Sequence, residues 1–241
     1  MELSVKPVGD QAVMAVFEQR IAEEVSREVM ALADALKTLE NEGIRETVPA
    51  FASLLVYYDP LKLDYGTLEQ KIRTLAGRNG KKAGTAGKTV KIPVCYGGRY
   101  GEDLRDVAEH ANLSEEEVVR IHSGRDYRIY MLGFLPGFPY LGGLDERLFT
   151  PRLESPRTRI PAGSVGIGGK QTGIYPMASP GGWRIIGRTP LTLFDPGGAG
   201  KLPYHAGDAI RFVPISEAEF ERMRKTAAEA DRADEHLEAY V

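Results

Sequence analysis

A run of positive charge in an otherwise acidic chain is the first feature that suggests chemistry. Between Arg147 and Arg188 there are seven cations and one acid, Glu154, although the 241-residue chain has a net charge of −3. An anion site explains the group, whereas surface arginines or pairing with the acidic C-terminal residues would explain its single members. Aromatic residues are not interleaved with these cations as they are on nucleic-acid surfaces, so a small anion or a partner protein is the favoured ligand. The cations are Arg147, Arg152, Arg157, Arg159, Lys170, Arg184 and Arg188.

The glycine-rich stretch GSVGIGGKQTG, residues 163–173, lies inside this basic run. It does not match a phosphate-binding P-loop, because Gly169-Lys170 is followed by Gln171 rather than by serine or threonine, and it lacks the dinucleotide-binding spacing. The N–H groups of Gly168 and Gly169, together with Lys170 and the Gln171 amide, are typical of a site for an anion or an oxyanion. A plain hairpin of a β-barrel is the alternative interpretation.

Trp183, the only tryptophan, stands in the sequence SPGGWRIIG and is followed by Arg184. The two glycines before it, Gly181 and Gly182, let the backbone approach another group closely. A lone tryptophan is usually a core residue, but a tryptophan beside an arginine and two glycines also suits the wall of a ligand pocket.

His122 is the histidine that could take part in proton transfer. It ends a predicted helix just before the stretch SGRDYRIYMLGF, so it is either a helix-terminal cation or, if the chain folds it toward residues 131–143, a general acid/base. The four histidines do not have metal-ligand spacing and Cys95 is the only cysteine, so no metal site is predicted.

The segment MLGFLPGFPYLGG, residues 131–143, contains four glycines and two prolines but no charge. This composition is unfavourable for a helix or a central strand, because proline removes a backbone donor and glycine costs conformational entropy. We expect a stiff apolar loop at the rim of a barrel, which would line a pocket or dock a partner. The residues expected to do so are Phe134, Pro136, Gly137, Phe138 and Tyr140.

The elements before residue 85 have the pattern of a small α+β sandwich. Two short strands are predicted within residues 3–17, a helix over 21–40, a strand over 52–59, and a second helix with Thr67 as its N-cap. The glycine- and lysine-rich residues 77–88 are the best candidate for a linker. We therefore place the N-terminal domain at residues 1–85.

Residues 86–241 are predicted to form a closed or nearly closed β-barrel with a C-terminal helical tail. A strand at TVKIPVCY is followed by two short helices, and the second has the capping-box spacing of Ser114 and Glu117. Many short strand-like pieces separated by glycine and proline follow. Ser216 and Glu219 form another capping box before the acidic tail. The chain lacks a signal peptide, an apolar stretch long enough to span a membrane and a cysteine pair, so a cytoplasmic location is expected.

Taken in order, three stretches closely resemble the allophanate hydrolase subunit 1 family, which includes the B-type subunits of 5-oxoprolinase (PxpB) and the sporulation-kinase inhibitor KipI. They are YRIYMLGFLPGFPYLGGL, PRLESPRTRIPAGSVGIGGKQTGIYPMASPGGWRIIGRTPLTLFDP and HAGDAIRFVPI. The resemblance is dense from about Val90 to Ile215 and looser over residues 1–85. It implies an N-terminal α+β domain followed by a cyclophilin-like β-barrel.

The resemblance also implies a function and partners. Members work with a C-type subunit (KipA- or PxpC-like), and the 5-oxoprolinase complex adds a third subunit and uses ATP to open 5-oxoproline to glutamate. A Mg²⁺ ion would accompany the ATP, which partner subunits would bind or help to bind. The alternatives are a KipI-like inhibitor of sensor histidine kinase autophosphorylation and, more weakly, a carboxyltransferase-type subunit acting on urea or allophanate.

For the 5-oxoprolinase hypothesis, the candidate residues fall into two groups. His122 would be the acid/base, and Lys170, Gln171, Gly168 and Gly169 would stabilise developing negative charge. Substrate or anion contacts are expected from Arg157, Arg184, Trp183 and Phe134. Neither a nucleic acid nor a membrane is expected as a partner.

Overall fold

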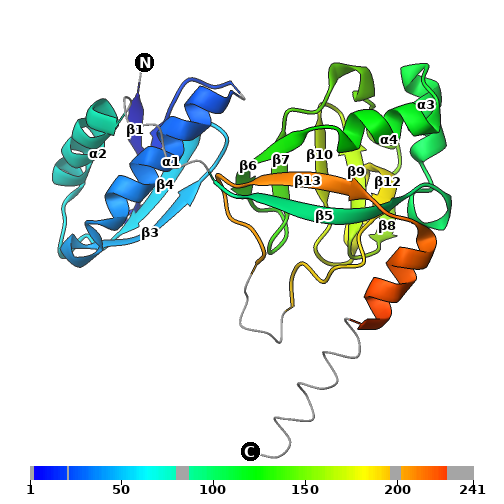
Figure 1. Ribbon diagram of the computed structural model, residues 1–241. Coiled ribbons are helices and arrows are strands. Elements are labelled where there is room, and N and C mark those ends of the chain that lie inside the picture. Colours follow the sequence, from blue (N-terminus) through cyan, green and yellow to red (C-terminus); the bar gives the residue numbers. More distant parts are fainter. Residues whose placement is uncertain (1–2, 21, 80–86, 196–201, 227–241) are drawn as a thin grey trace, which may run out of the picture. The chain divides into compact units, whose positions relative to one another are not determined.

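The structure is a computed structural model that describes residues 3–20, 22–79, 87–195 and 202–226 (Figure 1). The chain divides into two compact units, one of Met1–Lys88 with Ala206–Asp208 and one of Thr89–His205 with Ala209–Val241. The predicted domain boundary between residues 85 and 86 lies outside the described residues, and so do most of the predicted linker and the tail from residue 227 onward.

The N-terminal unit is a four-stranded antiparallel sheet with two helices packed against it (Figure 1). The strand order is β1-β2-β4-β3. In α1, Val25, Val29, Leu32 and Leu36 recur at helical spacing and are buried against the sheet. The elements are β1 (Ser4–Pro7), β2 (Ala12–Val16), α1 (Glu23–Lys37), η1 (Glu40–Glu42), β3 (Ile44–Pro49), β4 (Ser53–Tyr58) and α2 (Tyr65–Asn79).

Three details of this unit differ from the sequence predictions. The helix predicted over 21–40 ends at Lys37 and is followed by the short 3-10 helix η1. Strand β3 was not predicted, because only its first residue, Ile44, is buried and its sequence IRETVP is largely polar. Asp64, not Thr67, caps α2, since its carboxylate accepts hydrogen bonds from the Thr67 backbone N–H at 3.0 Å and hydroxyl at 2.6 Å.

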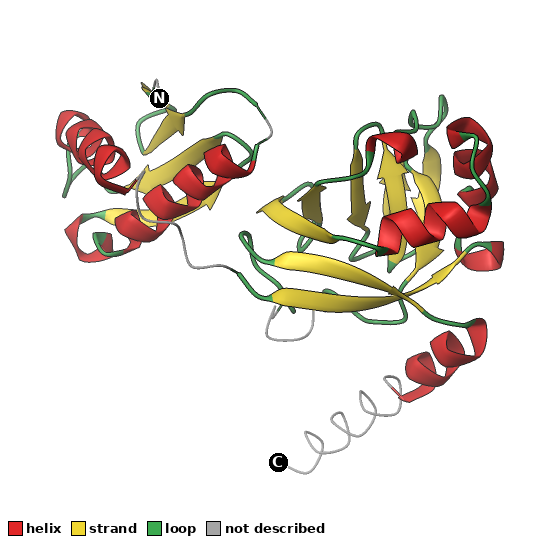
Figure 2. Ribbon diagram, turned by 45° about the horizontal axis from the view of Figure 1, so that its top comes forward, coloured by secondary structure: helices red, strands yellow, loops and turns green. Residues whose placement is uncertain are grey.

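The second unit is built on a closed barrel with the strand order β10-β7-β6-β13-β5-β12-β9, and β8 and β11 form a separate pair. Figure 2 shows the strands of this unit in yellow and its helices in red. The α+β fold class predicted from the sequence, with a barrel as its second part, is confirmed. The strands are β5 (Thr89–Tyr96), β6 (Asp126–Leu132), β7 (Pro139–Gly142), β8 (Arg157–Ile160), β9 (Ser164–Gly168), β10 (Gln171–Ile174), β11 (Ser179–Gly181), β12 (Arg184–Arg188) and β13 (Ala209–Pro214).

The helices of this unit carry the predicted caps. Ser114 and Glu117 make both hydrogen bonds of a capping box before α4 (Glu115–Ser123), which follows α3 (Leu104–Ala111). Glu219 likewise exchanges hydrogen bonds with Ser216 at the start of the helix formed by residues 217–226. Two short 3-10 helices, η2 (Gly98–Tyr100) and η3 (Glu146–Leu148), complete the unit. Among the described helices, none is long and apolar enough to cross a membrane.

The apolar segment 131–143 is only partly a loop. Residues 133–138 form a tight turn, but β7 follows it and pairs with β6 on one side and β10 on the other. The expectation that this segment avoids a central strand was therefore wrong for residues 131–132, which end β6, and for residues 139–142. Pro139 is tolerated because it is the first residue of its strand, where a missing N–H costs little.

Candidate functional site

An aromatic pocket of about 100 Å³ lies at the turn between β6 and β7. Its walls come from distant parts of the barrel unit, so the fold and not the sequence brings them together. The aromatic lining residues are Phe134, Phe138, Tyr140, Tyr175 and Trp183, and the others are Arg152, Gly181 and Gly182.

Phe138 is the hub of this aromatic cluster. Its ring centroid lies 5.2 Å from that of Tyr140, 5.4 Å from that of Tyr175 and 5.6 Å from that of Trp183, each with an edge-to-face orientation. Such pairs contribute about 0.5–1.5 kcal/mol beyond the area they bury. Since Phe138, Tyr175 and Trp183 are all at most 5% exposed, the cluster forms a rigid wall and not a mobile surface.

Phe134 projects from the tip of the turn. It is 66% exposed and has a left-handed backbone with a φ of +67°, which is costly for an aromatic residue. The turn is held by hydrogen bonds from the Gly133 N–H to the Phe138 carbonyl and from the Tyr204 hydroxyl to the Gly137 carbonyl. The predicted rim residues Phe134, Phe138 and Tyr140 do line the pocket, whereas Pro136 is exposed and is not among its lining residues.

Two glycines of the β9–β10 hairpin make room for Trp183. A Cβ on Gly168 would lie 2.4 Å from the indole Nε1, and one on Gly173 would lie 3.0 Å from the indole ring and 3.1 Å from Phe138. The distance at Gly168 is too short for real atoms, so this position needs glycine for Trp183 to pack as it does, whereas a side chain at Gly173 would require its neighbours to shift slightly. The predicted binding residues Gly168 and Trp183 are thus in direct contact, but Gly168 acts by packing.

Arg152 contributes the positive charge of the pocket. Its guanidinium carbon lies 5.9 Å from the centroid of the Trp183 ring, a cation–π distance. The backbone on both sides of it is fixed: Thr150 exchanges two hydrogen bonds with Gly169, and the Leu153 N–H donates to the Gly182 carbonyl at 2.7 Å. The exposed Arg152 side chain therefore extends from an ordered loop.

The two arginines predicted to contact an anion are engaged elsewhere. Arg157 pairs with Glu102 at 3.1 Å and with Asp103 at 2.8 Å, and Arg184 pairs with Asp106 at 2.7 Å. These carboxylates stand in and just before α3, so the acids that neutralise Arg157 and Arg184 come from there. Once these ion pairs are taken into account, the basic run has a much smaller net positive charge than its sequence suggests.

Both pairs hold strands and loops in place. Asp103, only 4% exposed, also accepts a hydrogen bond from the Ile185 N–H at 2.6 Å and so ties β8 to β12. Arg184 also donates to the Pro151 carbonyl at 3.4 Å, next to Arg152. The structure thus gives Arg157 and Arg184 positioning contacts within the barrel unit.

In the β9–β10 turn, one of the backbone N–H groups expected to hold an anion is already engaged. Gly169 has a φ of +67°, but its N–H already donates to the Thr150 carbonyl at 2.8 Å. Lys170 is exposed, with its ammonium 5.8 Å from the centroid of the Phe149 ring, and Gln171 pairs with Gly168 across the hairpin. Lys170 and Gln171 therefore lie at the turn that follows Gly168, and neither is among the residues that line the pocket.

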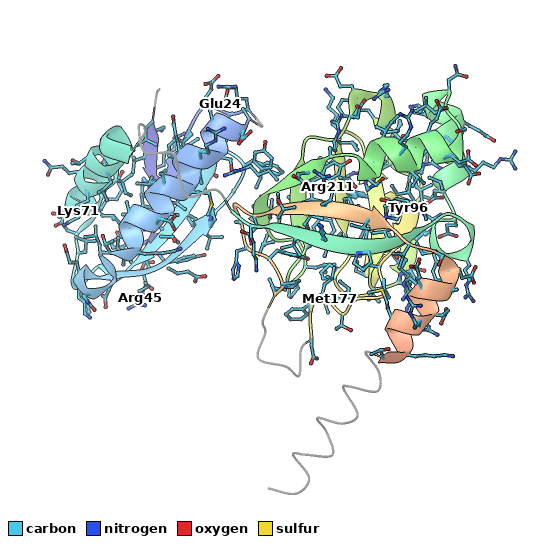
Figure 3. All side chains as sticks on the ribbon, viewed as in Figure 1. Glu24, Arg45, Lys71, Tyr96, Met177 and Arg211 are labelled. Carbon is cyan, nitrogen blue, oxygen red and sulfur yellow. The ribbon has the colours of Figure 1, made fainter. Side chains whose placement is uncertain are left out.

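His122 lies in the barrel core, where it is completely buried. Its Nε2 lies 2.8 Å from the Thr172 hydroxyl, its Nδ1 lies 2.8 Å from the hydroxyl of Tyr96 (labelled in Figure 3), and its ring stacks on Phe212. Because the Thr172 hydroxyl donates to the Gly166 carbonyl, Nε2 carries the imidazole proton and Nδ1 accepts from Tyr96. Complete burial lowers the pKa of His122 from 6.5 to about 3, so it is neutral at neutral pH. The predicted acid/base role gains no support from this position.

Sequence reasoning did not select two residues of the pocket, Arg152 and Tyr175. Arg152 was one of seven cations with nothing in the sequence to distinguish it, and Tyr175 directly follows strand β10, where an aromatic residue is ordinary. Burial raises the pKa of the Tyr175 phenol to about 12, so the hydroxyl remains protonated at neutral pH. Among the described residues, no group of three histidine, cysteine or carboxylate side chains is placed to hold a metal ion.

These features define an α+β protein in which a closed barrel carries a small aromatic pocket with an arginine at its edge. Residues 3–203 match the family described as carboxyltransferase domain, subdomain C and D, and the chain belongs to this family. The family resemblance drawn from the sequence motifs is thereby confirmed.

Named relatives cover nearly the whole chain. It is 41% identical over 231 residues to the B-type subunit of 5-oxoprolinase from Bacillus subtilis (strain 168), an alignment that covers 92% of this chain and 96% of that protein. Among solved structures, PH0987 from Pyrococcus horikoshii is 51% identical with a TM-score of 0.54 and covers 90% of this chain and 100% of its own. TTHA0988 is 37% identical with a TM-score of 0.76, and the match covers 86% of this chain and 40% of that longer one.

Proposed function

We propose that this chain is the B-type subunit of an ATP-dependent 5-oxoprolinase, which opens 5-oxoproline to glutamate only together with partner subunits. The observation that carries the proposal is the 41% identity to the B-type subunit of 5-oxoprolinase from Bacillus subtilis (strain 168) over nearly the full length of both chains. Because that name denotes one subunit of an enzyme, the proposal includes a C-type subunit and a third subunit as partners.

The aromatic pocket suits this substrate in size and chemistry. 5-Oxoproline is a small five-membered lactam with one carboxylate, and the pocket of about 100 Å³ has space for a molecule of that order. The edges and faces of Phe138 and Trp183 would contact the apolar ring, and a cation at the rim would contact the carboxylate. The buried wall would also keep bulk water away from one face of the ring.

The reaction needs activation, because a lactam is a poor electrophile at neutral pH. Transfer of the γ-phosphoryl group of ATP to the lactam oxygen would give an activated imidate. Attack of water at the former carbonyl carbon, with protonation of the ring nitrogen and cleavage of the C–N bond, would open the ring to an acyl phosphate. A second water would hydrolyse this acyl phosphate to glutamate and inorganic phosphate. Within this chain, Lys170 is proposed to contact phosphoryl oxygens, since it is exposed at the β9–β10 turn, and Gln171 to donate a hydrogen bond there.

ATP is proposed to bind mainly to partner subunits. The sequence has no P-loop, and the pocket of about 100 Å³ is far too small for a nucleoside triphosphate. The described residues also lack a metal-binding group, so none is assigned to a Mg²⁺ ion that accompanies ATP. The proton acceptor for the attacking water is likewise proposed to belong to the partner subunits, because His122 is enclosed in the barrel core.

The test is 5-oxoproline-dependent ATP hydrolysis, measured with this chain alone and then with the purified C-type and third subunits. The proposal expects glutamate and ADP to form only in the mixture. In that mixture, Lys170→Ala should lower turnover at least about tenfold, because a charge-assisted contact is removed. Formation of glutamate from 5-oxoproline by the partners without this chain would contradict the proposal.

The two alternative functions have their own assays. A KipI-like protein would inhibit autophosphorylation of a purified sensor histidine kinase without the C-type subunit, and the exposed Phe134 at the tip of its turn is the apolar group that such a kinase would meet. A carboxyltransferase-type subunit would require urea in place of 5-oxoproline. Inhibition of the kinase, with no turnover in any mixture of folded subunits, would replace the enzyme proposal.

A further inference from the structure

We propose that Arg152 binds the carboxylate of the substrate, with its guanidinium at cation–π distance from Trp183, and that it sets the specificity of the pocket for ring compounds that carry a carboxylate. This inference rests on the proposed function for the identity of the substrate. It assigns the recognition to a residue other than the arginines that the sequence favoured.

Other cations of the basic run are engaged. Arg157 and Arg184 are bound by acids in and just before α3, Arg147 pairs with Asp145 at 2.9 Å, and the Arg188 Nε donates to the Ala162 carbonyl at 2.8 Å. Arg152 is the cation of this run that lines the pocket, and within the described residues no carboxylate pairs with it. A carboxylate ligand would therefore not have to displace an internal ion pair.

The contact with Trp183 does not occupy all the donors of Arg152. The guanidinium carbon lies 5.9 Å from the centroid of the indole ring, and the guanidinium has five N–H donors arranged in a planar fork. Two of those N–H groups match the two oxygens of a carboxylate in a bidentate hydrogen bond. The indole thus positions the cation without consuming the donors.

The loop that carries Arg152 is fixed before any ligand arrives. The neighbouring residues Thr150, Pro151 and Leu153 are hydrogen-bonded to Gly169, Arg184 and Gly182, respectively. Pre-ordering of this kind reduces the conformational entropy that is lost when a ligand binds. The lining also includes Tyr175, whose protonated hydroxyl adds a polar group without adding a negative charge that would repel the carboxylate.

The test uses the single tryptophan as a reporter, because Trp183 lines the pocket. The full chain is titrated with 5-oxoproline and with 2-pyrrolidinone, which has the same lactam ring but no carboxylate. The variants are Arg152→Gln, Arg152→Lys and the control Arg159→Gln, which removes an exposed arginine of β8 from the same basic run. The same variants are then assayed for 5-oxoproline turnover in the complex with its partner subunits.

We expect the tryptophan signal to respond to 5-oxoproline at concentrations at least about tenfold lower than to 2-pyrrolidinone. Arg152→Gln should remove this preference and raise KM about 10- to 100-fold with little change in kcat, because a binding contact is lost. Arg152→Lys, which keeps the charge but not the planar fork, should give a smaller rise in KM. Arg159→Gln should match the wild type.

The outcomes separate the two proposals. An unchanged KM in Arg152→Gln, in a complex that hydrolyses 5-oxoproline, would overturn the role of Arg152 and leave the proposed function standing. A response that prefers the carboxylate and depends on Arg152, in a complex that never turns over 5-oxoproline, would support the binding role and overturn the function. An equal response to 5-oxoproline and 2-pyrrolidinone would also overturn the role of Arg152.

Discussion

The imidazole of His122 lies in a buried environment where a positive charge is energetically unfavourable. The ring is completely buried, both of its nitrogens are used by the hydroxyls of Tyr96 and Thr172, and Phe212 covers one face. These contacts all suit the neutral form. They explain why the pKa falls to about 3, and they tie the end of α4 to the hairpin that carries Gly168.

This environment makes the stability of the protein depend on pH. Between about pH 6.5 and pH 3 the unfolded chain binds a proton at His122 and the folded chain does not, so the free energy of unfolding should fall by up to about 1.4 kcal/mol per pH unit as the pH is lowered. Urea unfolding at several pH values measures this slope. It should be shallower in His122→Gln and unchanged in His110→Gln, which removes an exposed histidine of α3. Equal slopes in wild type and His122→Gln would contradict the argument.

Gly168 is the residue on which the position of Trp183 depends most directly. In Gly168→Ala the new methyl group would lie 2.4 Å from the indole Nε1, so the indole must move. We expect a red-shifted tryptophan emission, a several-fold rise in KM for 5-oxoproline in the complex, and a loss of about 1–3 kcal/mol in the free energy of unfolding. The control is Gly77→Ala in α2, where an added Cβ meets no atom within 4 Å. An unshifted emission in Gly168→Ala would show that the pocket absorbs the methyl group.

At the scale of elements, α3 acts on the pocket through the loop before β8. Asp106 of α3 forms an ion pair with Arg184, and Arg184 donates a hydrogen bond to the Pro151 carbonyl next to Arg152. Asp106→Asn should therefore raise KM for 5-oxoproline about three- to tenfold and cost less than about 1 kcal/mol of stability, because the ion pair is partly exposed to solvent. Steady-state kinetics and urea unfolding give the two quantities. Glu109→Gln, which breaks the exposed Arg105–Glu109 pair on the same helix, should change neither, and a KM that moved equally in both variants would refute the connection.

The elements that the sequence predicted best are those in which local chemistry agrees with the fold. Ser114 with Glu117 and Ser216 with Glu219 cap their helices as expected, since a capping box needs only residues three positions apart. Strand β3 was missed because it has few buried residues, so its pairing with β4 depends on a neighbour and not on its own pattern.

The candidate site was less predictable, because it too depends on neighbours and not on local sequence patterns. Phe134, Phe138 and Trp183 could be singled out from composition and glycine spacing. Which arginines form ion pairs could not be predicted, because Asp103 lies 54 residues from Arg157 and Asp106 lies 78 residues from Arg184 along the chain. Which cation is neutralised and which faces the pocket is decided only when α3 packs beside β12.

At the scale of the whole molecule, every residue that lines the pocket belongs to the barrel unit. The lining comes from the β6–β7 turn, the loop before β8, the end of β10 and the segment before β12, all between residues 134 and 183. The N-terminal unit has a separate hydrophobic core of its own. Substrate binding and the N-terminal unit should therefore be separable.

A chain that lacks residues 1–79 tests this separation. Its Kd for 5-oxoproline, measured by Trp183 fluorescence, should stay within about threefold of the full chain, since the hydrogen bonds that fix Arg152 and Trp183 all lie in the barrel unit. Far-UV circular dichroism and the pH slope set by His122 would show that the barrel is folded. If that folded barrel lost its response to 5-oxoproline, the pocket would depend on the N-terminal unit. If it kept the response but the reconstituted complex lost turnover, the N-terminal unit would serve assembly or catalysis and not substrate binding.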